Sequence, residues 1–139
     1  MAAGGDNNFM RYVYMGQEGE FIPLGATHII VHESVTVIRA RAFVEHPNIV
    51  EVICHYKVEK IEEWAFFDCC SLRRVIMPGV TIVEERAFGL CEALTDVECG
   101  KLEIIQNGAF YCCRSLRIIN LPSARIVGSY AFSDCESLM

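Results

Sequence analysis

An alanine–phenylalanine pair returns along this chain at a nearly constant interval. Successive phenylalanines are 23, 22, 22 and 22 residues apart, at Phe43, Phe66, Phe88, Phe110 and Phe132. A fixed period of this length indicates a repeat architecture, in which each unit stacks on the next. One unit cannot bury its apolar face alone, so folding and stacking are expected to be the same event. The sequence therefore predicts a repeat solenoid.

Other residue types keep the same register against each phenylalanine. Six residues later stands Ile49, Leu72, Leu94, Leu116 or Leu138. Three residues later stands His46 in the first copy, and then Cys69, Cys91, Cys113 and Cys135. Five residues earlier stands Ile38, Ile61, Val83, Ile105 or Val127. These ladders predict a continuous buried column of Phe, Cys and aliphatic side chains.

Within one unit, the spacing of apolar residues changes from strand-like to helical. Residues 95–99 place Val97 on the buried side of a short alternating segment, which predicts a strand. Ala87, Phe88 and Cys91 fall on one face of a helical turn, so we expect a 3₁₀ turn or a single α turn there. The bends that follow the strands are marked by Pro78, Gly100 and Pro122.

The repeat resembles the BspA-type leucine-rich repeat. The shared pattern is Val-x-x-Ile-x-x-x-Ala-Phe-x-x-Cys-x-x-Leu-x-x-Val-x-x-Pro, and residues 58–78 are its best copy. A period near 22 also lies in the leucine-rich-repeat range of about 20–29 residues. The resemblance implies a right-handed coil with a parallel β-sheet on one face and short 3₁₀ or α turns on the other. It also implies a role in binding, adhesion or scaffolding, and it supplies no catalytic or cofactor residues.

The pattern divides the chain into two segments. Residues 26–139 are predicted to form the leucine-rich-repeat domain, with about five coils of which the last is incomplete. Residues 1–25 lie outside the pattern and are predicted to form an N-terminal capping segment. Within it, residues 9–14 and 20–22 are expected to pair as a hairpin around Gly16.

Two irregularities interrupt the array. The first full copy has His46 at the cysteine position and one extra residue between Ile49 and Val58, which predicts a local bulge. The sequence also stops just after Leu138, before the strand that should follow. We therefore expect an array that is cut short, with an uncapped C-terminal coil through which the protein self-associates.

Eight cysteines are present, and four of them form the repeated ladder of Cys69, Cys91, Cys113 and Cys135. We expect inert core thiols, because free cysteine is among the most buried residue types. A disulfide between adjacent rungs is the open alternative, since coils about 4.8 Å apart would permit one. A metal site is disfavoured because a straight ladder does not converge on one point. A nucleophilic Cys54 is disfavoured because its neighbour His55 points to the opposite face of the strand.

Two ladders are predicted on the exposed face of the sheet, where repeat proteins often bind partners. The charged ladder contains Glu51, Arg74 and Asp96, between His28 and Ile118. The apolar ladder contains Ile30, Ile53 and Ile76, followed by Glu98 and Asn120. An apolar stripe of this kind marks a partner-binding face, or it only stabilises the stacked strands. Trp64 is expected to be partly buried on the other side and is a further candidate contact.

The composition narrows the range of possible functions and partners. The net charge of −6, from 18 acidic and 12 basic residues, disfavours nucleic acid and anionic membranes as partners. The sequence has neither an export signal nor an apolar run that could span a bilayer, so we expect a cytoplasmic protein. The leading hypothesis is a non-catalytic protein–protein interaction or scaffold module without a cofactor. A surface adhesin or carbohydrate-binding repeat protein is the alternative, and a thiol enzyme or metal protein comes third.

Overall fold

The computed structural model describes residues 9–139, which form ten short strands joined by turns. Residues 1–8 of the predicted capping segment lie outside the described residues. The strands are β1 (Arg11–Tyr14), β2 (His28–Val31), β3 (Val37–Ile38), β4 (Glu51–Ile53), β5 (Lys60–Ile61), β6 (Arg74–Ile76), β7 (Ile82–Val83), β8 (Asp96–Glu98), β9 (Ile104–Ile105) and β10 (Ile126–Val127). Between residues 9 and 139 there is no helix, and thus none that could cross a membrane.

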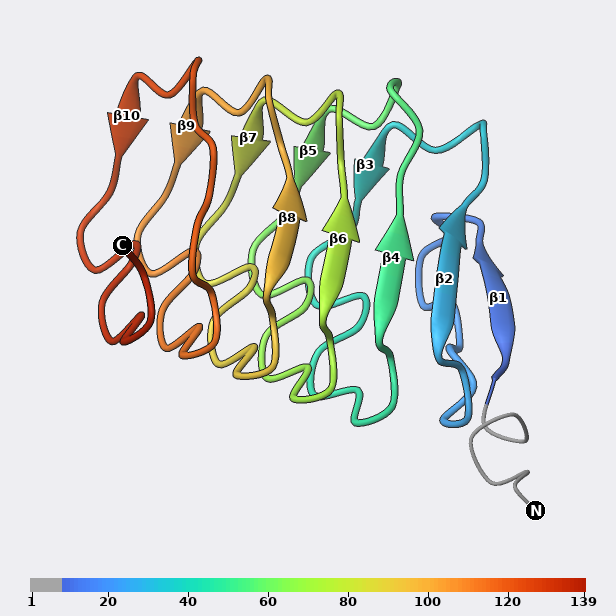
Figure 1. Cartoon of the computed structure of the whole chain (residues 1–139). Coiled ribbons are helices and arrows are strands. Elements are labelled where there is room, and N and C mark those ends of the chain that lie inside the picture. Colours follow the sequence, from blue (N-terminus) through green and yellow to red (C-terminus); the bar gives the residue numbers. More distant parts are fainter. Residues whose placement is uncertain (1–8) are drawn as a thin grey trace.

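Two five-stranded parallel sheets run along the length of the molecule (Figure 1). The first has the order β1-β2-β4-β6-β8, and the second has the order β3-β5-β7-β9-β10. Each strand pairs with its equivalent one repeat later, so that Val52 lies opposite Val75 and Ile61 lies opposite Val83. This arrangement confirms the predicted parallel solenoid. The second sheet was not predicted, because strands of two residues leave almost no alternation in the sequence.

The core lies between the two sheets. The first sheet points Ile29, Val52, Val75 and Val97 inward, and all four are buried. The second sheet contributes Ile38, Ile61, Val83 and Ile105, each fully buried. Because every strand supplies only one or two inward side chains, a coil is stable only against its neighbours. The strand predicted at residues 95–99 is observed as β8.

The segment around each phenylalanine is a series of turns, so the expected 3₁₀ or α turn is wrong. The residues two before and two after the phenylalanine have positive φ, as at Trp64 (61°) and Asp68 (59°). This alternation lets Phe66 N–H donate to Ala87 O of the next coil at 2.7 Å, whereas Phe67 N–H donates to Trp64 O within its own coil at 3.2 Å. A left-handed non-glycine residue costs about 1–2 kcal/mol. The hydrogen bonds between the turns of neighbouring coils offset that strain.

The repeated phenylalanines form one continuous aromatic stack. Neighbouring ring centroids are 5.0, 5.1, 5.3 and 5.3 Å apart, and neighbouring rings lie within 7° of parallel. Each pair of this kind adds about 0.5–1.5 kcal/mol beyond the burial of its area. The ring of Tyr14 from β1 lies 5.1 Å from Phe43 and is tilted by 54°, so it covers the N-terminal end of the stack without continuing its parallel arrangement.

The N-terminal segment does not form the expected hairpin. Residues 20–22 form no strand, and β1 pairs in parallel with β2, from Arg11 opposite His28 to Tyr14 opposite Val31. As an added parallel rung, β1 can place Tyr14 over the phenylalanine stack and continue the first sheet. An antiparallel partner would have interrupted the register that all other strands share.

His46 replaces the repeated cysteine for a structural reason. Its imidazole Nδ1 accepts the Asn48 N–H at 3.2 Å, which leaves the proton on Nε2. The Nε2–H then donates to Pro23 O at 2.9 Å. A cysteine side chain is too short to span from the first full coil to the N-terminal segment, whereas an imidazole spans this gap.

The extra residue of the first full coil widens a turn and does not bulge a strand. Val58 N–H donates to His55 O at 3.2 Å and closes a turn whose tip, Tyr56, is 74% exposed. The His55 ring holds this turn in place, because its Nδ1 accepts Lys57 N–H at 3.1 Å and its Nε2 donates to His32 O at 2.9 Å. Strand β4 before the turn keeps its regular pairing with β2 and β6.

The last coil completes the second sheet but not the first. Strand β10 pairs with β9, whereas residues 117–121 form no strand beside β8. Val127 is 53% exposed, although Ile105 at the equivalent position is fully buried. Side chains at this end are thus less buried than their equivalents in earlier coils, and both the incomplete last coil and self-association through it stay predictions.

Candidate functional site

The outer face of the first sheet carries the predicted apolar ladder in register. Ile30 lies opposite Ile53, Ile53 lies opposite Ile76, and Glu98 follows. Strand β1 adds Val13 opposite Ile30, and Val13 is 43% exposed. The isoleucines are half-buried, so each offers part of its side chain to solvent. Sequence reasoning missed Val13 because it assigned this residue to a hairpin.

The charged ladder lies beside the apolar one on the same face. Arg74 Nη1 is 3.3 Å from Glu51 Oε2, and Arg74 Nε is 3.2 Å from Asp96 Oδ2. One guanidinium thus bridges three coils, as the alternation of charge predicted. Solvent-exposed pairs contribute at most about 1 kcal/mol each, so their larger effect is to fix the charge pattern of the face.

The predicted fifth rung does not belong to the first sheet. Ile118 and Asn120 lie in a segment without strand pairing, and Ile118 is 74% exposed. The ladders therefore end at Asp96 and Glu98 of β8.

A second outward ladder was not predicted. It follows the second sheet through paired strands, with Val37, Lys60, Ile82, Ile104 and Ile126. Its three isoleucines lie in β7, β9 and β10, whereas the isoleucines of the first ladder lie in β2, β4 and β6, nearer the N-terminal end of the molecule (Figure 1). The signal was present in the sequence, since these residues stand six positions before each phenylalanine.

The repeated cysteines are hydrogen-bond donors of the core. Cys69 Sγ donates to Phe43 O at 3.0 Å, and Cys91 Sγ donates to Phe66 O at 3.1 Å. The same bond recurs at 3.2 and 3.1 Å from Cys113 and Cys135. Burial raises the pKa of Cys69 to about 12 and raises the pKa of Cys91 well above its ordinary value. A buried thiol that donates to a carbonyl and resists ionisation is a poor nucleophile.

Two thiols depart from this buried pattern. Cys70 is exposed and Cys135 is half-buried. A hydrogen bond with Cys113 lowers the pKa of Cys135. Cys54 is buried, and the neighbouring His55 ring is committed to its turn. Within residues 9–139, no three His, Cys, Asp or Glu side chains gather in a way that could hold a metal ion.

Trp64 lies half-buried on the turn side, as expected. The guanidinium carbons of Arg41 and Arg86 lie 5.0 and 5.6 Å from its ring centroid, and the Phe67 ring lies 4.3 Å away. The two arginines occupy the same left-handed position as Trp64 in the coils on either side. Cation–π contacts of this kind orient Arg41 and Arg86 along the surface.

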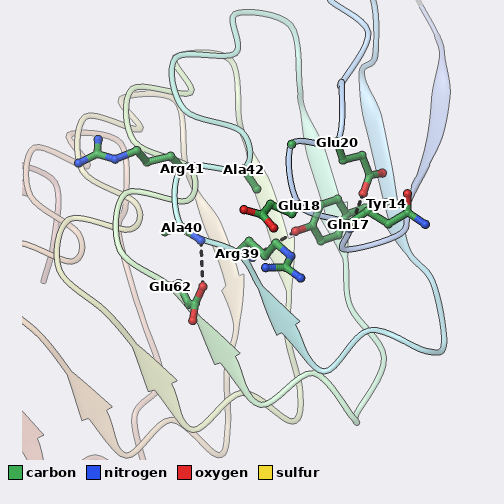
Figure 2. Close-up of a pocket in the computed structure, with 10 residues that line it drawn as sticks. Tyr14, Gln17, Glu18, Glu20, Arg39, Ala40, Arg41, Ala42 and Glu62 are labelled. Atoms are coloured by element: carbon green, nitrogen blue, oxygen red, sulfur yellow. Dashed lines mark hydrogen bonds between the residues drawn. The ribbon is translucent and has the colours of Figure 1, made fainter.

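A cavity of about 300 Å³ lies between the N-terminal loop and the first full coil (Figure 2). Residues 17–20 form one wall and residues 39–42 form the other, with Tyr14 and Glu62 at its edges. Arg39 Nε donates to Gly16 O at 2.6 Å, and Ala40 N–H donates to Glu62 Oε1 at 3.0 Å. The cavity was not predicted, because its loop wall belongs to no repeated position.

One carboxylate of the cavity holds the loop together. Glu20 accepts the Tyr12 O–H at 2.5 Å and the N–H groups of Met15 and Gln17, each at 3.0 Å. Burial and this carboxylate raise the pKa of Tyr12 to about 12. Burial opposes ionisation of Glu20, but the hydrogen bonds outweigh it and lower the pKa of Glu20. Glu20 is therefore a structural acceptor.

The comparisons with known proteins agree with this geometry. A family model described as a BspA type leucine rich repeat region matches residues 18–139 with six copies. The chain belongs to the BspA-type leucine-rich-repeat family. Members of this family are generally interaction or surface-binding modules and are typically non-enzymatic.

Solved structures of bacterial leucine-rich-repeat proteins share the fold. A leucine-rich-repeat protein of T. pallidum is 27% identical, with a TM-score of 0.70 over 94% of this chain and 57% of its own. A leucine-rich-repeat protein of Bacteroides ovatus is 22% identical, with a TM-score of 0.59 over 84% of this chain and 40% of its own. A leucine-rich cell surface protein of Faecalibacterium prausnitzii is 22% identical, with a TM-score of 0.54 over 82% of this chain and 38% of its own.

This BspA-type chain therefore spans little more than half of the first of these proteins and less than half of the others. No curated protein sequence matches it.

Proposed function

We propose that this BspA-type chain is a non-catalytic module that binds a protein through the outer face of its first sheet. The observation that carries the proposal is the in-register stripe of Val13, Ile30, Ile53 and Ile76 beside the ladder centred on Arg74. Protein interfaces combine an apolar centre, poor in charge, with a polar rim. This face has that composition on a rigid scaffold.

The apolar stripe contains more exposed hydrophobic residues than the stacking of strands requires. Stacked β-branched side chains stabilise a sheet, but the core already contributes a fully buried column between the two sheets. At the next rung Glu98 replaces isoleucine, and β6 and β8 still pair in regular register. Isoleucine is thus not needed at this position for pairing, which favours a role for the exposed stripe in contact with a partner.

The test is a matched pair of double variants. Ile53→Asp with Ile76→Asp places two charges on the first sheet, and Ile82→Asp with Ile104→Asp places two charges at equally half-buried positions of the second sheet. Both proteins should retain their β-type circular dichroism and cooperative unfolding. Affinity capture with the full chain, quantified by mass spectrometry, should lose a specific partner only with the first-sheet variant. Equal recovery with both variants would refute the assignment of this face.

We further propose a reducing, intracellular site of action. The support is that all eight cysteines are free, six of them buried, and that the ladder thiols act as hydrogen-bond donors to carbonyls. Free cysteines in such number are typical of reducing compartments. Fractionation with an antibody to the chain tests this location. Recovery of the native protein outside the cell would favour the surface-adhesin alternative instead.

A further inference from the structure

One position of each coil contributes to a row of residues along the surface of the turns. It is the left-handed position two residues before each repeated phenylalanine, where φ lies between 54° and 64° in every copy. The members of the row are Arg41, Trp64, Arg86, Gly108 and Tyr130. Glycine has no side chain, so the row is interrupted between Arg86 and Tyr130.

The first three members show how this row holds an aromatic ring. The guanidinium carbon of Arg41 lies 5.0 Å from the centroid of the Trp64 ring, and that of Arg86 lies 5.6 Å from it. Both distances are within the limit of about 6 Å for a cation–π contact. A cation, a ring and a second cation thus follow one another in successive coils. A ring at the place of Gly108 would continue this alternation.

A cavity of about 280 Å³ lies at the interruption of the row. A Cβ atom on Gly108 would lie 3.1 Å from Cγ of Arg86, so the arginine side chain borders this space directly. On the other side stands Tyr130, which is 73% exposed. The cavity is lined by Arg86, Asn107, Gly108, Tyr111, Ser129 and Tyr130. None of these residues is acidic, so the charge of Arg86 is not opposed within the lining.

The floor of the cavity is held in place by hydrogen bonds between coils. Gly108 N–H donates to Ser129 O at 2.9 Å, and Ser129 N–H donates to Asn107 Oδ1 at 2.9 Å. Arg86 Nη1 lies 3.6 Å from Glu85 Oε2. Guanidinium N–H groups lie in the plane of the group, so this ion pair uses an edge and leaves the flat faces for aromatic rings. The cavity therefore needs little rearrangement to take a ring.

We propose that this cavity binds an aromatic side chain of a partner protein, which enters the row between Arg86 and Tyr130. The rings of the phenylalanine stack are 5.3 Å apart in these coils. A ring midway between Arg86 and Tyr130 would be about as far from each, which suits a cation–π contact (within about 6 Å) and an aromatic pair (about 4.5–7 Å). Ligand pockets usually measure about 300–1,000 Å³, so this small cavity suits a single side chain.

Two other features define the proposed ligand. The net charge of −6 opposes the phosphates of a nucleic acid, so we assign the ring to a protein and not to a base. The site lies on the turns and contains no residue of the first-sheet face. It goes beyond the proposed function and does not depend on it.

Small probes can stand in for the side chain of the partner. The ¹⁵N-labelled full chain is titrated with N-acetyl-tyrosinamide and, separately, with N-acetyl-tryptophanamide. We expect saturable shifts of the Gly108 amide signal and none at Gly100, an exposed glycine in another turn. N-acetyl-leucinamide, which is apolar but has no ring, should not saturate. The proposal is overturned if neither aromatic probe saturates, if the leucine probe saturates equally, or if adenosine alone does so.

Three variants test the residues assigned to the site. Arg86→Gln should weaken binding of both aromatic probes about two- to five-fold, because it removes one exposed cation–π contact. Arg41→Gln is the matched control, since it removes the contact on the other side of Trp64 and should leave binding unchanged. Gly108→Trp should abolish binding, because Trp64 shows that this left-handed position accepts tryptophan and the new ring would fill the cavity.

Cooperative unfolding shows which variants are folded, and the two arginine variants decide the question if Gly108→Trp does not fold. Equal weakening by Arg41→Gln and Arg86→Gln would contradict the assignment. Undiminished binding by a folded Gly108→Trp protein would contradict it as well.

Discussion

Replacement of Phe88 by alanine should destabilise the solenoid by about 4 kcal/mol, within the range of about 3–5 kcal/mol for a buried phenylalanine. The ring is fully buried and stacks 5.1 Å from Phe66 and 5.3 Å from Phe110. The variant therefore leaves a cavity and removes two aromatic pairs. Phe132 has one stacked neighbour and is only half-buried, so its replacement should cost roughly half as much.

Urea unfolding followed by the fluorescence of Trp64, the single tryptophan, measures both losses. The slope of free energy against urea should stay the same in the two variants, so that the difference reflects stability alone. Equal losses for Phe88→Ala and Phe132→Ala, or a loss below about 2 kcal/mol for Phe88→Ala, would refute the aromatic stack as a main support of the array.

Other parts of the structure give further predictions. Arg74→Ala removes two ion pairs and should cost at most about 2 kcal/mol, and the loss should vanish at about 1 M salt, as urea titrations at two salt concentrations will show. His46→Ala should cost about 1–2 kcal/mol through its two lost hydrogen bonds and speed hydrogen exchange at Asn48. Thiol titration of the native protein should find only Cys70 and Cys135 reacting fast, and a third fast thiol would contradict the buried ladder. Burial raises the pKa of Cys54 from 9.0 to about 12, so the unfolded chain loses this proton first; stability should fall as pH rises from about 9 toward 12, measured by urea midpoints.

The sequence was sufficient to predict the parallel register of the first sheet. The repeat forces equivalent side chains to stack, and its first interval is 23 residues, so the pairing of Glu51 with Arg74 and of Ile53 with Ile76 followed from counting. The buried cysteine ladder followed from the same count. The hydrogen bonds from these cysteines to phenylalanine carbonyls could not be predicted, since they depend on the direction in which each carbonyl points.

The backbone conformation of the turns around each phenylalanine could not be predicted from the sequence pattern. Ala87, Phe88 and Cys91 have helical spacing, but a left-handed residue two positions before and after each phenylalanine redirects the backbone toward the neighbouring coil. No residue type marks these positions, which hold Arg41, Trp64, Arg86, Gly108 and Tyr130 before the phenylalanine. Contact between coils, and not local propensity, decides this conformation.

The prediction of a hairpin in the N-terminal segment was wrong for a related reason. Residues 9–14 and 20–22 have the composition of two strands, and a turn at Gly16 made a hairpin the local solution. The open edge of β2 offers a longer parallel pairing and a place for Tyr14 on the aromatic stack, so the tertiary contact prevails. The cavity of Figure 2 arises from this arrangement and therefore could not be predicted from the repeat.

Site-specific photo-crosslinking tests the proposed binding face most directly. A photoreactive phenylalanine analogue replaces Ile53 in one protein and Ile82 in another, because both positions are half-buried and lie on opposite sheets. With the partner recovered by affinity capture, we predict a crosslinked product from position 53 and none from position 82. Crosslinking from position 82 alone would show that the partner binds the second sheet and would contradict the proposed function of the first.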